Sequence, residues 1–482
     1  MFDPFEKSIQ QLQDAFSNGE LSSVELVKYY LDRIDQYNGK LYAVEHISPT
    51  AIADAQKLDD ERAAGKVRSV LHGIPLVIKE NYDTIGMATT ASCSALESFY
   101  PNTEGYVIKK LREAGAIILA KTTMSEFARH GWTSGTAFGQ AHNPYDLTRT
   151  PGGSSGGSGI AVAMNFSAAG LGSDTVNSVR SPCSACNLVG IRPTLGLWSR
   201  TGILPCTDIQ DSGGPMARTV ADAVILLDIA RGYDESDAIT SAQLGNTPAN
   251  YMDYLNPDGL KNKRIGVLRN NFGNDSDILS VMEYNLEVMR KAGCELIELD
   301  EPLLESGYVF GKCDVQLYET RSCLQRYFDS HPSCPISCLD DLVAGELIHE
   351  SIKADFTACS EIQTPLETSE YAEKISNIAS LRNLLSKIFT EYRLDAICYP
   401  HQSQLVSKIG SNNQPERNGP LTSMSGLPSI VIPGGFSTPC ETAPIGVPIG
   451  IEFIANTWNE PKLIEIAYAL EQLTRFRHTP II

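Results

Sequence analysis

A lysine and two serines in the 482-residue chain have the side chains and the surroundings needed for a proton relay. Lys79 ends the short apolar run 74–78. Burial lowers the pKa of a lysine, and a neutral lysine can act as a general base for a serine hydroxyl. Ser154 lies in the glycine- and serine-rich run 152–159, and Ser178 lies in the polar loop 172–180. Lys79 alone could equally be a snorkelling or ion-paired lysine.

The run 152–159 has three other interpretations. A phosphate-binding loop would end in Lys followed by Ser or Thr, and this run does not. A flexible linker disagrees with the apolar, element-rich sequence on both sides. The residues Gly152, Ser154 and Gly156 match the nucleophile-elbow pattern, but that motif requires a buried strand immediately before the serine. The preceding segment 143–151 is loop-like, so the elbow interpretation fails.

Cysteine spacing argues against a metal site. Cys183 and Cys186 form one CxxC pair, whereas a zinc site would need a second suitable pair, and none is present. The twelve cysteines are irregularly spaced, which favours reduced thiols in a cytoplasmic protein over a disulfide framework.

Charge and hydropathy exclude several classes of partner. The formal net charge is −19, which disfavours direct binding to nucleic acid. No apolar stretch reaches the roughly 20 residues that span a bilayer, and the first residues do not resemble a secretory signal. We therefore expect a cytoplasmic protein without nucleic-acid or membrane partners.

Alternating short strands and helices predict an α/β fold with a mixed central sheet flanked by helices. Expected strands cover 41–47, 74–79, 116–120, 264–268, 294–299 and 395–399, and expected helices cover 50–65, 104–115, 122–129, 278–292, 368–392 and 461–473. We expect one domain over 1–482. It would begin with a helical segment over 1–65, where Ser22 and Glu25 form a capping-box pattern, and would carry a variable substrate-side insertion near 300–365.

The combination of Lys79, the 152–159 run and the 172–180 loop resembles the amidase-signature family over most of the chain. The separations of 75 residues from Lys79 to Ser154 and 24 from Ser154 to Ser178 match those of the family. Further matches include Lys121-Thr122 and the segment 426–436.

The resemblance implies a role for each residue. Ser178 is the nucleophile that forms an acyl-enzyme. Ser154, expected to follow a cis peptide bond from Gly153, passes the proton between Ser178 and Lys79, which is the terminal base. Backbone N–H groups of Thr175, Val176 and Asn177 would form the oxyanion hole. No metal or organic cofactor is implied.

Other residues take supporting places by the same resemblance. Asp174 and Arg180 are expected to brace the nucleophile loop as an ion pair. Gly131 and Trp132 are expected to be pocket walls, and His130 is either a pocket residue or a packing residue. Residues near Met424 are further wall candidates.

One departure from the family pattern changes what can be expected. Val176 and Asn177 stand where the family usually has two glycines, so their side chains could strain the loop or reshape the pocket. A catalytically silent relative that acts as a binding protein is therefore one alternative.

The expected activity is hydrolysis of a carboxylic amide, at carbon–nitrogen bonds other than peptide bonds, in a small-molecule substrate. Esters, carbamates or an amine acceptor would suit the same relay. A further alternative is the amidotransferase component that releases ammonia from glutamine for a tRNA-bound partner. The sequence identifies neither the substrate nor the oligomeric state, and a homodimer stays open.

Overall fold

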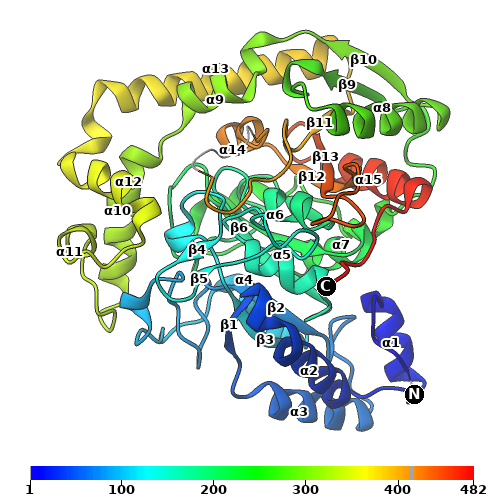
Figure 1. Ribbon diagram of the computed structural model, residues 1–482, viewed down its shortest axis with the longest axis vertical. Helices are drawn as coiled ribbons and strands as arrows, with labels where there is room; N and C mark the ends of the chain where they lie inside the picture. Colours follow the sequence, from blue (N-terminus) through cyan, green and yellow to red (C-terminus); the bar gives the residue numbers. More distant parts are fainter. Residues whose placement is uncertain (1, 412–416) are drawn as a thin grey trace.

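A single mixed sheet organises the computed structural model, which describes residues 2–411 and 417–482 (Figure 1). Within these residues, eleven strands follow the order β1-β3-β2-β6-β8-β7-β12-β13-β11-β9-β10. Their bounds are β1 Val44–Ile47, β3 Ile117–Thr122, β2 Pro75–Lys79, β6 Ala169–Asp174, β8 Ser212–Ala217, β7 Val189–Arg192, β12 Ser429–Phe436, β13 Pro448–Ile454, β11 Ala396–Pro400, β9 Arg264–Leu268 and β10 Glu295–Leu299. A separate small hairpin joins β4 Ser134–Gly135 to β5 Gly139–Gln140. The predicted α/β class with a mixed sheet is confirmed.

The strands near the relay candidates run parallel. Strand β2 lies between β3 and β6 and is parallel to both, and every residue of β2 and β6 is buried. Parallel strands covered on both faces are typically apolar throughout, as the sequence of β2 is up to Lys79. Because β2 and β6 are neighbours, the segments that follow them emerge at the same edge of the sheet.

Helices flank the sheet. In the described residues, α5 and α6 contact each other and the strands near the centre. Helix α15 contacts both α7 and α8, of which α7 packs against β8 and β7 and α8 packs against β12. The α-helices are α1 Ile9–Ser17, α2 Ser23–Leu41, α3 Ala51–Ala63, α4 Tyr106–Glu113, α5 Gly156–Ala163, α6 Arg180–Ala185, α7 Val220–Ala230, α8 Ser276–Lys291, α9 Ser306–Cys313, α10 Gln316–Ser330, α11 Leu339–Ala344, α12 Glu350–Glu361, α13 Ser369–Glu391, α14 Pro420–Ser425 and α15 Glu460–Thr474. The capping box of Ser22 and Glu25 at the start of α2 is present as predicted.

Helices α10 to α12 form a lobe at one side of the molecule (Figure 1). This lobe has a hydrophobic cluster of its own, in which Leu324, Leu342 and Phe356 pack with Phe99 and Phe127 from the sheet-side loops. Apolar burial of this kind is the main force holding a segment to its support. The lobe is therefore fixed against the loops that follow β2 and β3.

The two outermost strands of the sheet are β1 and β10. Strand β10 is largely solvent-accessible, and its Glu295 and Glu298 form ion pairs with Arg264 and Arg269. Strand β1 has a bulge where it pairs with β3.

One expected helix is wrong. Residues 122–129 contain only the 3-10 turn Glu126–Ala128, in which Phe127 and Ala128 have φ of 51° and 58°. The segment is instead tied to its surroundings, because Ser125 N–H donates to Ser154 O and Phe127 N–H donates to Ala91 O. Tertiary hydrogen bonds thus override a helix-compatible local sequence. No helix among the described residues is both long and apolar enough to cross a bilayer.

Candidate active site

The side chains of Lys79 and Ser154 meet in the interior. Lys79 is the last residue of β2, and Ser154 lies just before α5, after a cis peptide bond from Gly153, as expected. Lys79 Nζ is 2.7 Å from Ser154 Oγ and 2.8 Å from Ser173 Oγ. Both Lys79 and Ser154 are fully buried. The structure therefore brings a lysine and a serine 75 residues apart into one hydrogen bond.

Lys79 has a proton affinity suited to exchange near neutral pH. Burial lowers the pKa of its ammonium group to about 7, against weaker opposing contributions from Cys206 and Asp174. None of the ion pairs formed by the described residues involves Lys79. The equally buried Lys121, by contrast, lies 3.6 Å from the carboxylate of Glu80. Lys79 can therefore shed its proton more readily than a salt-bridged lysine.

The glycines around Ser154 allow the chain to approach its neighbours closely. A Cβ atom on Gly157 would lie 2.4 Å from Thr123 O and 2.5 Å from Ala43 O. Only glycine fits such an approach between backbones. The glycine-rich run is thus a packed helix start, which places Ser154 against the end of β3.

Ser178 lies in the loop between β6 and α6 and borders a cavity of about 680 Å³. Its carbonyl oxygen accepts a hydrogen bond from Ser155 N–H at 3.2 Å, so the two serine-bearing loops are joined through the backbone. No hydrogen bond within the described parts of the chain links the hydroxyls of Ser154 and Ser178. Hydrogen bonds between catalytic groups are often long or misaligned without substrate.

The three expected oxyanion-hole residues also border this cavity. No hydrogen bond of the described residues uses the N–H of Thr175, Val176 or Asn177 as donor. Neither Val176 nor Asn177 has a positive φ. The two side chains that replace glycines therefore sit on unstrained backbone, and the N–H groups stay available.

Two features accommodate Asn177. A Cβ on Gly419 would lie 2.4 Å from Asn177 Cβ and 2.5 Å from Val176 O, so glycine at 419 provides the space. Arg417 Nη1 donates to Asn177 Oδ1 at 3.2 Å. The departure from a glycine pair is thus matched by neighbouring residues.

A buried ion-pair network braces the loop that carries Ser178. Asp174 lies 3.0 Å from Arg180 and 2.9 Å from Arg192, and Arg180 lies 2.6 Å from Glu452 on β13. Arg180 also donates to Val176 O at 2.7 Å. Burial acts to raise the pKa of Asp174, but Arg180 and Arg192 outweigh it and hold that pKa well below its usual range. The loop is therefore held by ion-paired residues that do not border the cavity.

The cavity wall is partly as expected. Trp132 and His130 border it, whereas Gly131 does not. The guanidinium of Arg417 covers Gly131, since a Cβ there would lie 1.9 Å from Arg417 Nη1. Met424 is buried in α14, away from the cavity.

Several residues around the site carry no local sequence signal. Ser173, the second acceptor of Lys79, lies on β6, although the sequence alone predicts a polar loop from residue 172. Asp314, Gln316 and Cys359 reach the cavity from the segment that spans α9 to α12. Only the fold brings these residues to Ser178.

The sequence is similar to known proteins over nearly its whole length. The Amidase family matches residues 25–464, and this chain belongs to that family, whose enzymes act on carbon–nitrogen bonds. A "Probable amidase" of Arabidopsis thaliana is 34% identical, with 98% of this chain and 91% of that protein covered. A glutamyl-tRNA(Gln) amidotransferase chain of Thermoanaerobacter pseudethanolicus is 31% identical, with 98% and 97% covered.

A solved structure confirms the fold. The native peptide amidase from Stenotrophomonas maltophilia superimposes with a TM-score of 0.88 at 33% identity, with 99% of each chain covered.

Proposed function

We propose that the protein hydrolyses a carboxylic amide of a small molecule through an acyl-enzyme on Ser178. The observation that supports this most strongly is the hydrogen bond of 2.7 Å between buried Lys79, whose pKa is lowered to about 7, and Ser154. A neutral amine held against a hydroxyl next to the nucleophile loop is the arrangement that general-base catalysis requires.

The proposed first half-reaction moves one proton. Ser178 Oγ attacks the amide carbon while its proton passes to Ser154 Oγ, which gives its own proton to Lys79 Nζ. The oxyanion is bound by backbone N–H groups of Thr175, Val176 and Asn177; each such donor typically contributes ~3 kcal/mol. Lys79 then returns the proton through Ser154 to the leaving nitrogen, and the carbon–nitrogen bond breaks.

Water completes the cycle by the same route. It loses a proton to Lys79 through Ser154 and attacks the acyl-enzyme ester. Lys79 then returns this proton through Ser154 to Ser178 Oγ as the ester carbon–oxygen bond breaks, which releases the carboxylic acid and restores Ser178 and neutral Lys79. We propose that substrate enters through the cavity of about 680 Å³, and that the whole chain acts as one domain with the segment from α9 to α12 as its substrate side.

A fluorophosphonate probe tests the nucleophile. Intact-mass and peptide-map analysis should find one adduct, on Ser178, that is absent from Ser178→Ala. Ser181→Ala is a matched control, because Ser181 is a buried serine of the same region at the start of α6. An adduct that survives Ser178→Ala, or no adduct at all, would overturn the assignment.

The similarity to glutamyl-tRNA(Gln) amidotransferase chains supports a second candidate, glutamine-dependent ammonia release. A panel of simple amides, peptide amides, glutamine, esters and carbamates separates the two. Hydrolysis of simple amides by the isolated chain supports the first proposal. Turnover of glutamine alone, or only after a partner is added, supports the second.

A further inference from the structure

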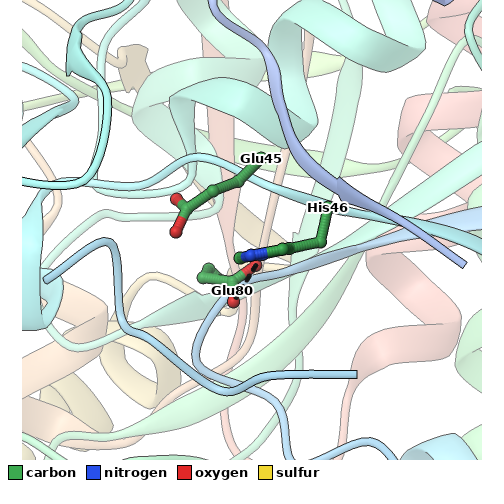
Figure 2. A group of neighbouring side chains, drawn as sticks. All are labelled: Glu45, His46 and Glu80. Carbon is green, nitrogen blue, oxygen red and sulfur yellow. Dashed lines mark ion pairs between the residues drawn. The ribbon is translucent and has the colours of Figure 1, made fainter. Parts of the chain in front are cut away.

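Three ionisable side chains meet on the side of β2 that faces away from Ser154. Glu45 and His46 come from β1, and Glu80 directly follows Lys79 (Figure 2). One nitrogen or oxygen atom of each lies within 4.8 Å of the others. Glu80 N–H donates to Thr122 O at 3.0 Å, so the pairing with β3 continues one residue beyond β2, and alternation of adjacent side chains points Glu80 away from the Lys79–Ser154 pair. The cluster is therefore separate from the proposed relay.

A bulge explains how two successive residues of β1 can share one side. Val44 pairs with Thr122 and His46 with Lys121, so two steps along β1 match one step along β3, and Glu45 is the extra residue. A bulge of this kind re-aims a side chain that regular alternation would send to the other face. Without it, Glu45 and His46 would diverge.

Hydroxyl and amide donors hold the two carboxylates in place. Glu45 accepts from Thr90 Oγ1 at 2.5 Å and from Ser92 Oγ at 2.7 Å. Glu80 Oε1 accepts from Thr90 N–H at 3.2 Å. Outer hydrogen bonds of this type orient the ligands of metal sites.

Two buried ligand atoms of the cluster have no hydrogen-bond partner. They are Glu80 Oε2, on a fully buried side chain, and His46 Nδ1, which lies 3.4 Å from Glu80 Oε1. Buried polar atoms are nearly always satisfied, and exceptions indicate an ion or a water. These two unpartnered atoms are a second observation, separate from the closeness of the acidic residues, and they indicate a ligand.

The charges agree with a cation. Lys121 Nζ, 3.6 Å from Glu80 Oε1, offsets one carboxylate, and it is itself held by Ala88 O and Thr89 Oγ1. Besides Lys121, the described residues offer the two carboxylates only the imidazole of His46, whose Nδ1 lies 3.4 Å from Glu80 Oε1. Two carboxylates with one imidazole suit a transition-metal dication better than Mg²⁺ or Ca²⁺, which prefer all-oxygen sites.

We propose that Glu45, His46 and Glu80 bind one divalent transition-metal ion. The ion joins the edge strand β1 to the end of β2 and to the loop that carries Thr90 and Ser92. It has no part in the proposed amide chemistry, because it lies behind β2. The side chain of His46 is 34% exposed, which provides the route of entry.

Binding of Mn²⁺ to the full chain, freed of metal with a chelator, tests the proposal. Mn²⁺ is the probe because it favours oxygen and nitrogen over the thiols of this cysteine-rich chain. Loss of the free-ion electron paramagnetic resonance signal should show one equivalent bound. At a concentration of 100 times Kd, the melting temperature should rise by about 3 °C.

Variants locate the ion. Glu45→Gln and His46→Ala should abolish binding and the melting shift, whereas His142→Ala, at a partly buried histidine outside the cluster, should retain both. Circular dichroism of each metal-free variant shows whether it is folded. The proposal is overturned if wild type binds no Mn²⁺ up to about 1 mM, or if binding survives in both folded cluster variants. These outcomes do not depend on amide hydrolysis.

Discussion

In the proposed mechanism the protonation state of Lys79 is the first determinant of activity, because Lys79 is fully buried and donates its hydrogen bonds to neutral oxygen acceptors. The neutral form is the proposed base, and its pKa is lowered to about 7. The fraction of enzyme ready to accept a proton therefore rises with pH up to that value and is nearly complete above it.

This sets the pH dependence. For an uncharged amide substrate, kcat/KM should rise about tenfold per pH unit below pH 7 and level off above it. Initial rates from pH 5 to 9 measure the profile. A profile without any break between pH 5.5 and 8 would contradict Lys79 as the base.

Asn177 is one of the two residues expected from the sequence to stand in place of a glycine pair. Because its φ is not positive and its N–H is retained in any variant, glycine at this position should leave the oxyanion donors in place. We expect Asn177→Gly to lower kcat by less than about tenfold, through greater loop freedom worth ≲1 kcal/mol. Steady-state kinetics of Asn177→Gly and Ser178→Ala, measured side by side, give kcat for both variants. A fall in kcat as large as that of Ser178→Ala would refute the expectation.

At the scale of elements, strand β13 supports the loop that carries Ser178 through Glu452, which has no hydrogen bond to Ser178 itself in the described part of the chain. Glu452 accepts from Arg180 and from His401 Nδ1, both at 2.6 Å. Burial lowers the pKa of His401, although Glu452 opposes this shift. The carboxylate thus fixes Arg180, which in turn holds Val176 O.

Replacing Glu452 should alter turnover without touching the cavity. In Glu452→Gln one charge-assisted hydrogen bond to Arg180 is lost, about 1.5–3 kcal/mol. Expressed in the transition state, this corresponds to a fall in kcat of about 10- to 100-fold with little change in KM. Glu460→Gln is the control. Glu460, at the start of α15, is equally buried, but its carboxylate accepts a hydrogen bond from Thr194 N–H. Equal losses in both variants would show a general effect of buried charge.

Some of the elements were predictable, and their arrangement was not. The apolar run ending at Lys79 predicts β2, and the long helix expected over 368–392 is α13, whereas no strand was expected at the central strands β6, β8, β7, β12 and β13. The sequence could not show that β2 and β6 are neighbours, because strand order depends on long-range pairing. It also failed at 122–129, where contacts to Ser154 and Ala91 decide the backbone.

The candidate site divides in the same way. Motif residues such as Ser154 and Ser178 could be found because their spacing is a property of the chain alone. Asp314 and Arg417 could not, since they reach the cavity from distant segments. The cluster around Glu45 depends on a bulge that no local pattern announces.

At the scale of the whole molecule, the two ends of the chain are joined. Arg477, after α15, holds the carboxylate of Glu6 through Nη2 at 2.7 Å and Nε at 3.1 Å, and also donates to Ala163 O. Burial acts to raise the pKa of Glu6, but Arg477 outweighs it and the pKa is lowered. A carboxylate whose pKa is lower in the folded than in the unfolded protein stabilises the fold at pH values above the unfolded pKa. This stability is lost as the pH falls through the folded pKa.

Arg477→Gln should therefore destabilise the fold by about 1–3 kcal/mol at neutral pH, mainly by leaving Glu6 unpaired. The difference from wild type should shrink as the pH falls from the ordinary glutamate pKa of about 4.3 through the lowered pKa of Glu6. Urea midpoints at both pH values measure it. Arg475→Gln, at an exposed arginine nearby, should change little; an equal effect of both would assign the loss to the tail rather than to the ion pair.

The charged outer strand β10 also bears on how copies of the protein behave when crowded. An open sheet ends in unpaired backbone groups that can template a strand from another molecule. Glu295 and Glu298 are exposed on this edge strand and form ion pairs with Arg264 and Arg269. A strand of a second molecule that paired with β10 edge to edge would have to remove water from these charged side chains. The charged edge strand β10 therefore disfavours strand pairing between molecules, which allows the eleven-stranded sheet to end there in an exposed edge.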